Sequence, residues 1–463
     1  MIPNLTDTIC AVATAPGVGA IAVIRVSGPE TMKLMEQVFR PHSRKSFSAL
    51  KMRYAHFGVI RSRETVIDEV LCTLFCAPDS YTGEDSAEIS CHGSALIQQQ
   101  IMALLIGNGA RIAMGGEFTL RGFRNGKFDL AQAEAVADLI AADSDAARDL
   151  ALSQMRGGYS SRIKALREKL VNFAALIELE LDFSEEDVEF ADRSQLSNLL
   201  DELKDEIIAL SSSFSKGNVM KSGIPVTIIG KPNAGKSTLL NAILNEERAI
   251  VSDIPGTTRD VIEDTINING FSFRFIDTAG LRDSRDTIET IGIERTVEKI
   301  RQAQVILHIF DISETNPDEL QEEIDEFRNH LEDKSRRWIL IANKTDRLET
   351  IPSVFKDLVE LETVFVSAKR KENISVITDT LSRMVEKESV SDRTIVSNAR
   401  HYEALMSALQ AIEDVEKGFE MQVPSDLVAI DIRRALHLLG SITGEVTTDE
   451  VLGTIFGKFC IGK

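Results

Sequence analysis

The stretch from Gly230 to Ser237 has the composition of a phosphate-binding loop. It reads GKPNAGKS and matches the pattern G-x-x-x-x-G-K-[ST] in full. The glycines of such a loop let backbone N–H groups turn toward phosphate oxygens, and the N-terminus of the following helix adds positive potential. The ammonium group of Lys236 can neutralise phosphate charge, and the hydroxyl group of Ser237 can bind Mg²⁺. We therefore predict nucleotide contacts at Asn233, Ala234, Gly235, Lys236, Ser237 and Thr238.

Two further motifs follow in the order that a hydrolase of GTP requires. In PGTTRD, the hydroxyl group of Thr258 can complete the Mg²⁺ shell when a γ-phosphate is present. In DTAG, Asp277 can hold Mg²⁺ through water, and the amide of Gly280 can sense the γ-phosphate. The nucleotide contacts predicted in these two segments are Ser252, Asp253, Ile254, Pro255, Gly256, Thr257, Thr258, Asp277, Thr278, Ala279 and Gly280.

Two later motifs indicate guanine rather than adenine as the base. The carboxylate of Asp346, in NKTD, can accept both N–H groups on the edge of guanine, whereas adenine would leave that carboxylate unpaired at a cost in free energy. The motif SAK follows a predicted strand and can contact the base through its backbone. The contacts predicted here are Asn343, Lys344, Thr345, Asp346, Ser367, Ala368 and Lys369.

The residue that orients the attacking water is left open by these motifs. Leu281 stands directly after DTAG, where a Ras-like GTPase has a glutamine. A carboxylate further along the same segment could take that role, and the candidates are Asp283, Asp286 and Glu289. The neutral oxygen of Asn233 suits a monovalent cation, which could neutralise charge in the transition state as an arginine finger does.

Each of these loops needs a strand before it, and the sequence supplies one in each place. Between about residues 219 and 380, short β-branched runs alternate with charged stretches of helix length, which is typical of an α/β architecture. The predicted strands are Val226–Ile229, Phe271–Ile276, Val305–Phe310, Trp338–Ile341 and Val364–Val366.

Helical composition flanks this α/β segment on both sides. Residues 127–216 contain no proline, and their only glycines are Gly157 and Gly158; helical character returns at about residue 381. The simplest explanation is that the α/β segment is inserted into a helical domain whose two halves pack together. Spacings of three and four residues predict an amphipathic helix with an apolar face formed by Leu166, Leu170, Phe173, Leu176, Ile177 and Leu181.

The N-terminal segment has a different composition. It is rich in glycine and proline, and its short apolar runs, such as Ala20–Val26 and Val70–Phe75, favour strands of a compact α+β domain. The predicted fold class is therefore multidomain, with α/β and α+β parts: an N-terminal α+β domain, a discontinuous helical domain and an inserted Ras-like P-loop domain. Their predicted bounds are 1–125 for the N-terminal domain, 126–218 and 381–463 for the helical halves, and 219–380 for the insertion.

Composition and charge exclude several classes of protein. The 463 residues are 43% hydrophobic and 27% charged, close to the average of soluble globular proteins. No stretch approaches the roughly 18 to 20 consecutive apolar residues of a membrane span, and the first residues do not read as a signal peptide, so we expect a cytoplasmic protein without membrane contact. A net charge of −20 opposes broad attraction to nucleic acid, so any such contact must be local. Five scattered cysteines argue against disulfides or a zinc site.

Taken together, the motifs resemble those of the MnmE family, also called TrmE, of tRNA-modification GTPases. The resemblance rests on GKPNAGKS, SDIPGTTRD, DTAGLR with the later TIGIER, and the C-terminal tetrad CIGK. It extends over essentially the whole chain through DTICAVATAPGVGAIAVIRVSG, YTGEDSAEISCHG and KFDLAQAEAVADLI. The resemblance implies an N-terminal folate-binding domain that dimerises, a helical domain in two segments, and a GTPase domain inserted between them.

The resemblance also implies an activity and its partners. Members of the family act as homodimers with the FAD-binding protein MnmG, in a heterotetramer or larger complex. Together they install an aminomethyl or carboxymethylaminomethyl group at position 5 of the wobble uridine of certain tRNAs. The one-carbon unit comes from 5-formyl- or 5,10-methylene-tetrahydrofolate. GTP hydrolysis requires Mg²⁺ and accompanies the pairing of two GTPase domains across bound K⁺.

For the GTPase domain, the resemblance assigns roles that the motifs alone leave open. The water-activating carboxylate falls on Glu289, in ETIGIER, and joins Lys236 and Gly280 in the catalytic set. The Mg²⁺ ligands fall on Ser237 and Thr258. The K⁺ ligands fall on Asn233, Ser252, Ile254 and Thr257.

For the other domains, the resemblance assigns a folate site. Basic side chains suit the glutamate carboxylates of folate, and the carboxylate of Glu88 suits the N–H edge of the pterin. Cys460 matches the cysteine of the terminal tetrad, either as a reactive thiol or as a packing residue. The folate contacts fall on Arg25, Glu88, Lys127 and Lys463.

Two other functions are compatible with parts of the sequence. A regulatory GTPase of ribosome assembly would be expected to carry a basic RNA-binding appendage, whereas the segments that flank this α/β segment are acidic. A folate enzyme that is merely regulated by its GTPase domain differs from the family function only in where the chemistry takes place.

Overall fold

The structure, a computed structural model, describes residues 5–43, 46–63, 65–182, 193–247, 264–276, 293–329, 336–350, 361–386, 395–457 and 459–462. The chain divides into two compact units. The first comprises residues 1–137, 154–207 and 403–463, and the second comprises residues 138–153 and 208–402. Within the residues described, no helix combines the length and the apolar character needed to cross a membrane.

The first unit contains a mixed sheet with the strand order β3-β4-β5-β6-β2-β1-β7 in the described residues. β1 and β7 run parallel, and the other neighbours are antiparallel. The apolar runs 20–26 and 70–75 lie in β2 and β5, which confirms that they form strands. The strands are β1 (Ile9–Val12), β2 (Ile21–Ser27), β3 (Phe39–Pro41), β4 (Ala55–Ser62), β5 (Thr65–Phe75), β6 (Ser86–His92) and β7 (Arg111–Ile112).

Helices α1 (Thr31–Val38) and α2 (Ala95–Gly107) cover one face of this sheet. Successive residues of a strand point to opposite faces, so the alternate residues of β2, β4, β5 and β6 lie on the other face, where they are half-buried or exposed. The second face is therefore the more open one. The helix residues buried against the sheet include Leu34, Met35, Ile101 and Leu105.

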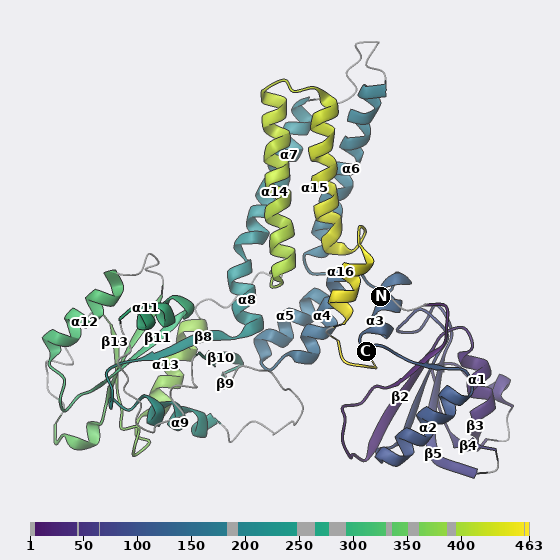
Figure 1. The fold of residues 1–463 in the computed structure, drawn as a ribbon, viewed down its shortest axis with the longest axis horizontal. Helices are drawn as coiled ribbons and strands as arrows, with labels where there is room; N and C mark the ends of the chain where they lie inside the picture. Colours follow the sequence, from purple (N-terminus) through teal and green to yellow (C-terminus); the bar gives the residue numbers. More distant parts are fainter. Residues whose placement is uncertain are drawn as a thin grey trace. The chain divides into compact units, whose positions relative to one another are not determined.

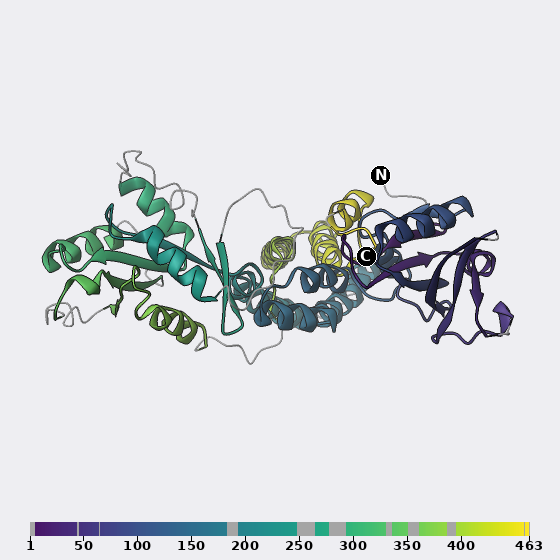
Figure 2. The ribbon, with the colours of Figure 1, turned by 90° about the horizontal axis from the view of Figure 1, so that it is seen from below.

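Helices from two distant parts of the sequence pack together in the first unit. α6 (Ser160–Asp182) contacts α15 (Ser425–Thr443) along its length, and Figure 1 shows both beside α7 (Arg193–Ser212) and α14 (Ala399–Glu420). Figure 2 views α14 and α15 nearly end-on. Ion pairs connect neighbours in this bundle: Arg162 of α6 with Glu206 of α7 at 3.1 Å, and Lys204 of α7 with Glu416 of α14 at 2.7 Å.

The second unit has three layers, with a mixed sheet between two pairs of helices (Figure 1). The strand order is β13-β12-β11-β8-β10-β9 in the described residues, and β9 pairs antiparallel with β10. α9 (Lys236–Glu247) and α13 (Ile374–Glu386) cover one face, and α11 (Ile293–Gln302) and α12 (Pro317–Asn329) cover the other. The strands are β8 (Ile224–Ile229), β9 (Asp264–Ile268), β10 (Phe271–Phe275), β11 (Val305–Asp311), β12 (Arg337–Asn343) and β13 (Glu362–Phe365).

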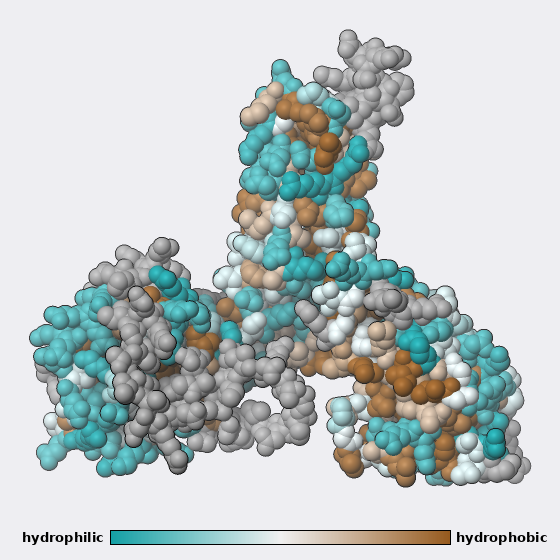
Figure 3. Space-filling view, in the orientation of Figure 1, coloured by the Kyte–Doolittle hydropathy of each residue, from teal (hydrophilic) through white to brown (hydrophobic). Residues whose placement is uncertain are grey.

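The outer surface over α12 is hydrophilic, as the acidic sequence of that helix requires (Figure 3). Other, mostly shorter helices occur in the described residues. They are α3 (Glu117–Arg124), α4 (Leu130–Ala141), α5 (Asp145–Met155), α8 (Phe214–Ser222), α16 (Asp449–Phe456), and the 3₁₀ helices η1 (Phe47–Ala49) and η3 (Thr345–Arg347).

The five strands predicted for the α/β segment are confirmed, with ends that differ by no more than two residues. β9 was not predicted. Its sequence, DTINI, is short, but it leads into Asn269 and Gly270, which both have positive φ angles of 49° and 83°. Asn-Gly at such angles is the strongest short-range hairpin signal, so this dipeptide could have revealed the β9–β10 hairpin.

The predicted apolar face of α6 is correct except at one position. Leu166, Leu170, Phe173 and Ile177 are buried, whereas Leu176 is 40% exposed. Leu176 lies three residues after Phe173 but about 100° around the helix from Ile177, so it falls at the margin of the apolar face. The side chain of Leu181 lies outside those described.

The buried Leu170 and the partly exposed Leu176 on α6 provide a test of how this helix packs in the bundle. We expect Leu170→Ala to lower the free energy of unfolding by about 2–5 kcal/mol, because the side chain is 1% exposed and its removal leaves a cavity. Leu176→Ala is the matched control and should change it by no more than about 0.5 kcal/mol. Urea unfolding of the full chain, followed by circular dichroism, measures both. Equal losses for the two variants would contradict this packing.

Candidate functional site

The glycine-rich loop connects β8 to α9, as the sequence predicts. Lys236 is the first residue of α9, and its Nζ donates hydrogen bonds to the carbonyl oxygens of Gly230, at 2.9 Å, and Lys231, at 3.3 Å. The ammonium group therefore reaches back across the loop. A cation held beside a helix N-terminus is the arrangement that attracts phosphate groups. Ser237, half-buried, is the next residue of the helix.

Two glycines of this loop occupy positions that a side chain could not share. Gly230 has a φ of +145°, and a Cβ atom there would lie 2.0 Å from the carbonyl oxygen of Ile309 in β11. Gly235 has a φ of +105°, and its Cβ would lie 2.3 Å from Nδ2 of Asn343. Both backbone conformations favour glycine, so the two glycines allow the loop to pack directly against β11 and the end of β12.

Asn343 connects the phosphate-binding loop to the loop after β13. Its Nδ2 donates a hydrogen bond to the carbonyl oxygen of Ala234 at 2.8 Å, and its Oδ1 accepts one from the backbone N–H of Ala368 at 3.0 Å. The residue is 3% exposed. One buried amide thus brings the motifs GKPNAGKS, NKTD and SAK together at one end of the sheet.

Asp346 lies against the SAK motif. Oγ of Ser367 donates a hydrogen bond to Oδ1 of Asp346 at 2.7 Å and accepts one from the backbone N–H of Arg370 at 3.2 Å. The hydrogen bond from Ser367 is the main reason why the pKa of Asp346 lies below its ordinary value. The carboxylate is therefore ionised at neutral pH, which is the form that accepts N–H groups from a base.

Asp311 is a residue of this site that the sequence reasoning missed. It ends β11 and is buried, and its Oδ2 accepts hydrogen bonds from Nζ of Lys344 at 2.6 Å and from Arg347 at 3.2 Å. Burial alone would raise the pKa of Asp311. The hydrogen bonds from Lys344 and Ser313 lower it by more than burial raises it, so the pKa lies below its ordinary value. A carboxylate at the carboxyl end of a central strand was the available signal.

The structure describes some of the other predicted nucleotide contacts of this unit, and the rest lie outside the described residues. Thr345 is half-buried, and Asn233, Thr238 and Lys369 are exposed. The predicted residues that lie outside the described part of the chain are Ser252, Asp253, Ile254, Pro255, Gly256, Thr257, Thr258, Asp277, Thr278, Ala279, Gly280 and Glu289.

The described residues supply part of each predicted metal site. No group of His, Cys, Asp and Glu among them has the arrangement of a metal site. Ser237 would offer one hydroxyl oxygen to Mg²⁺, and the exposed amide of Asn233 would offer one neutral oxygen to K⁺. Oxygen donors of these kinds suit such hard cations, so the residues present fit both ions.

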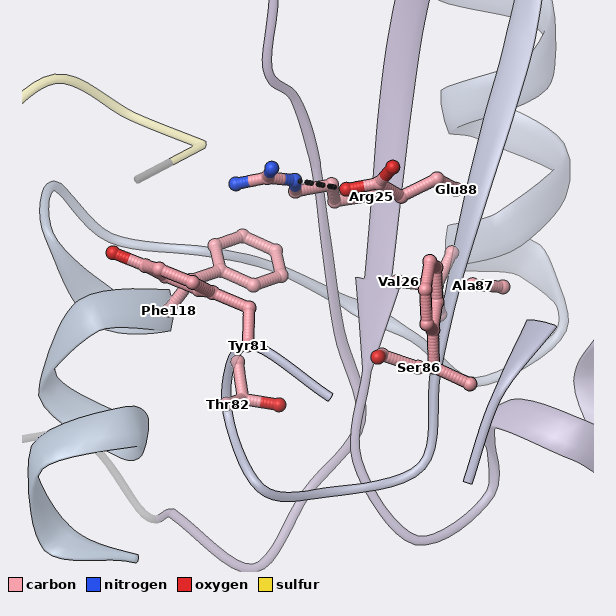
Figure 4. A pocket seen from close by; sticks show the side chains of 9 residues that line it. Arg25, Val26, Tyr81, Thr82, Ser86, Ala87, Glu88 and Phe118 are labelled. Carbon is pink, nitrogen blue, oxygen red and sulfur yellow. Dashed lines mark hydrogen bonds and ion pairs between the residues drawn. The ribbon is translucent and has the colours of Figure 1, made fainter. Parts of the chain in front are cut away.

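A pocket lies beside β2 and β6 in the first unit (Figure 4). Its volume is about 220 Å³, somewhat smaller than most small-molecule sites, and it is open to solvent. Tyr81 and Phe118, both labelled in Figure 4, supply aromatic rings to its lining. The residues that line it are Arg25, Val26, Phe75, Tyr81, Thr82, Ser86, Ala87, Glu88 and Phe118.

Arg25 and Glu88 meet at this pocket. They occupy paired positions on β2 and β6, and Nε of Arg25 donates a hydrogen bond to Oε1 of Glu88 at 2.8 Å. The guanidinium carbon of Arg25 also lies 5.4 Å from the centre of the Tyr81 ring, within reach of a cation–π interaction. Because an ion pair borders aromatic walls, the pocket suits a flat heteroaromatic ligand with N–H groups and anionic substituents.

The remaining predicted folate contacts are placed differently. Lys127 is exposed and does not line the pocket; its Nζ donates a hydrogen bond to the carbonyl oxygen of Pro78 at 3.0 Å, three residues before Tyr81. Lys463 lies outside the described residues. Tyr81 and Phe118 were not predicted as site residues. An aromatic residue at the start of the polar stretch YTGED was the signal that could have indicated Tyr81.

The C-terminal tetrad packs against the first unit's sheet. The carbonyl oxygen of Cys460 accepts a hydrogen bond from Gly116, at 3.3 Å, and Ile461 pairs with Gly115. Gly462 has a φ of +94° and lies so close to β1 that a Cβ atom would meet the carbonyl oxygen of Val12 at 2.4 Å. The tail therefore ends next to β1, the neighbour of the strand that carries Arg25. The Cys460 residue itself is exposed.

The second unit is thus an α/β domain in which the glycine-rich loop joins a central strand to a helix and contacts the loops after β12 and β13. Residues 8–127 match the family model described as "GTP-binding protein TrmE N-terminus", and residues 130–460 match that of the "MnmE helical domain". The chain belongs to the MnmE family of tRNA modification GTPases.

Full-length relatives support this assignment. The tRNA modification GTPase MnmE of Christiangramia forsetii is 50% identical over an alignment of 475 residues, which covers 99% of this chain and 100% of the relative. The protein of the same name from Bacteroides fragilis is 53% identical over 466 residues and covers 99% of both chains. That of Flavobacterium psychrophilum is 51% identical over 462 residues, again with 99% of both chains covered.

The position of Asp346 leads to a test of base recognition. We expect Asp346→Asn to weaken GTP binding at least about tenfold, because an amide cannot accept both N–H groups of guanine. Xanthosine triphosphate, which offers an acceptor in place of one donor, should bind the variant better than the original chain. Competition binding with a fluorescent nucleotide measures both. Asp318→Asn, on exposed α12, is the control and should leave both affinities unchanged. Unaltered GTP affinity in Asp346→Asn would contradict the assignment.

Proposed function

We propose that this chain, acting with the FAD-binding protein MnmG, adds an aminomethyl or carboxymethylaminomethyl group at position 5 of the wobble uridine of certain tRNAs. Family membership supplies the coarse function, GTP hydrolysis in tRNA modification. One observation supports the finer proposal: in the second unit Asn343 connects the phosphate-loop motif to the NKTD and SAK motifs, and the first unit has a pocket whose polar groups suit a folate.

The pocket's side chains match the two ends of a reduced folate. The pterin ring is flat and carries N–H groups along one edge, which the carboxylate of Glu88 can accept, and its face can lie against Tyr81. Arg25 already donates a hydrogen bond to Glu88 at 2.8 Å and so orients that carboxylate. We assign Lys127 and Lys463 to the glutamate carboxylates of the same ligand. The ligand would be 5-formyl- or 5,10-methylene-tetrahydrofolate, which supplies the one-carbon unit.

The nucleotide site hydrolyses GTP in this proposal. Lys236 and the backbone of the glycine-rich loop hold the phosphates, and Asp346 reads the guanine. Glu289 activates the water, and the amide of Gly280 senses the γ-phosphate. Mg²⁺ is held by Ser237 and Thr258, and K⁺ by Asn233, Ser252, Ile254 and Thr257. Two copies of the chain form the homodimer whose GTPase domains pair across K⁺.

Analysis of wobble uridines tests the function as a whole. In a cell that lacks this chain, mass spectrometry of tRNA nucleosides should show loss of the substituent at position 5, and the original gene should restore it. Arg25→Ala should fail to restore it, because the pocket loses the group that orients Glu88. Arg162→Ala, on α6 far along the sequence from the pocket residues, is the control and should restore it fully. Unchanged wobble uridines in the deletion strain would refute the proposal, and a ribosome-assembly defect in their place would favour the alternative function.

The assigned K⁺ ligands lead to a second test. GTP hydrolysis should be at least about tenfold faster in KCl than in NaCl at equal ionic strength, because K⁺ neutralises charge that develops in the transition state. Asn233→Ala should lose most of that difference while it keeps nucleotide affinity nearly unchanged. Steady-state phosphate release in the two salts measures the effect. Equal rates in both salts for the original chain would contradict the K⁺ assignment.

A further inference from the structure

One segment of the N-terminal sheet of the first unit is rich in positive charge. Residues 40–63 contain seven Lys and Arg residues and no Asp or Glu, although the whole chain carries a net charge of −20. Residues 1–125 as a whole have nearly equal numbers of basic and acidic side chains, so the charge of this segment is balanced elsewhere in the domain. The basic residues of the segment that the structure describes are Arg40, Lys51, Arg53, Arg61 and Arg63.

This segment forms one edge of the sheet: β3, the loop with η1, and β4. We call the exposed side chains of Arg40, Lys51, Arg53 and Arg63 the basic edge. Nearby carboxylates offset only part of its charge. Asp79 pairs with Arg53. The edge therefore keeps a surplus of positive charge on a chain that is otherwise acidic.

Exposed aromatic rings stand among these charges. Tyr54 is 59% exposed and Phe57 is 50% exposed. Nζ of Lys51 lies 5.5 Å from the centre of the Tyr54 ring, and the ring of His42 stacks on Phe57 with centroids 4.7 Å apart. In Figure 3, hydrophilic and hydrophobic residues are interleaved at this end of the first unit. Cations beside exposed rings are the combination with which proteins bind the phosphates and unpaired bases of single-stranded RNA.

The register of the sheet places Phe57 on the same face as the pocket. Phe57 of β4 pairs with Leu71 of β5, Leu71 pairs with Ser90 of β6, and Ser90 pairs with Val23 of β2. Two positions further along, Glu88 pairs with Arg25 on that same face. Adjacent strands are about 4.8 Å apart, so β4 and β2 are separated by about 14 Å. An RNA stem-loop is longer than this distance, so one stem-loop can contact both β4 and the pocket.

We propose that the basic edge binds the phosphate backbone of the tRNA anticodon arm and so presents a loop nucleotide to the pocket on the same sheet face. This inference rests on the proposed function of the pocket. The net charge of the whole chain opposes RNA binding, so we assign both the attraction and the orientation of the arm to the basic edge. An anticodon loop has unpaired bases, which match the exposed rings of Tyr54 and Phe57.

Other occupants fit this surface less well. A second copy of the chain, docked around a two-fold axis, would bring one basic edge against another, and the like charges would repel. An acidic protein would match the positive charge of the edge, but it would leave the exposed rings of Tyr54 and Phe57 without bases to stack on. Both are outcomes that the experiment below separates from tRNA binding.

A charge-reversal experiment on the full-length chain tests the inference. The edge variant carries Arg40→Glu, Lys51→Glu and Arg63→Glu. The control variant carries Lys33→Glu, Arg162→Glu and Lys169→Glu, which are exposed basic residues on α1 and α6 and give the same change in net charge. The probe is an unmodified tRNA transcript with uridine at the wobble position, and filter binding gives Kd at several salt concentrations.

The edge variant should bind the transcript at least about tenfold more weakly than the original chain, and the slope of log Kd against log salt should fall by about 2 to 3, roughly one unit per lost phosphate contact. The Kd of the control variant for the transcript should stay within about threefold of that of the original chain. Tyr54→Ala should weaken binding several-fold while it leaves the salt slope unchanged, because a ring contributes stacking rather than charge. Thermal unfolding and light scattering report on folding and on the mass of each variant.

The outcomes separate this inference from the proposed function. Equal weakening in the edge and control variants, or no binding of the transcript by the original chain, overturns the inference. Loss of dimer mass in the edge variant with unchanged tRNA affinity also overturns it and assigns the surface to a contact between copies. If the edge variant binds tRNA normally while the deletion strain still lacks wobble modification, the inference fails and the proposed function stands. If wobble uridines are unchanged in the deletion strain, the proposed function fails.

Discussion

The side chain of Asn343 is the contact on which the nucleotide site depends, because it connects loops that are far apart in the sequence. Its amide bonds Ala234, 109 residues earlier, and Ala368, 25 residues later. Removal of a buried amide with two partners would leave those backbone groups unpaired, at a cost of about 1–3 kcal/mol each. The same contact explains Gly235, since any side chain there would collide with Nδ2 of Asn343. One side chain therefore holds the predicted phosphate-binding loop and the predicted base-binding loops together.

Asp311 plays a related part at the end of the neighbouring strand. It accepts hydrogen bonds from Lys344 and Arg347, which flank the base-reading Asp346 in the chain. Lys344 has a φ of +66°, a conformation that most residues avoid, and its bond to Asp311 helps to offset that strain. Strands β8, β11 and β12 run parallel, so their carboxyl ends and the loops that follow meet at one edge of the sheet. The functional loops converge there for that reason.

The features predicted from sequence are those whose signals are local. The loop GKPNAGKS and the strands of the second unit are determined by a few adjacent residues, so they could be recognised without a structure. Arg25 and Glu88 lie 63 residues apart, and their contact depends on the register of β2 and β6. The resemblance assigned both residues to a folate site, but neither it nor composition predicted that contact. The aromatic wall of Tyr81 and the buried Asp311 depend on tertiary packing, which no periodicity encodes. The charge of residues 40–63 was visible in the sequence but disappeared when it was averaged over residues 1–125.

That uneven charge has a physical consequence for a protein that acts on RNA. A uniformly basic chain would bind every phosphate backbone in the cell, because counterion release rewards any such contact. A chain with a net charge of −20 opposes nonspecific binding over most of its surface, so an RNA is retained only where positive charge, stacking rings and shape coincide. Phe57, which stands among these charges, lies on the sheet face that also holds Arg25 and Glu88, so in the proposed arrangement binding of the RNA also places it near the pocket. An acidic background thus favours specificity over affinity.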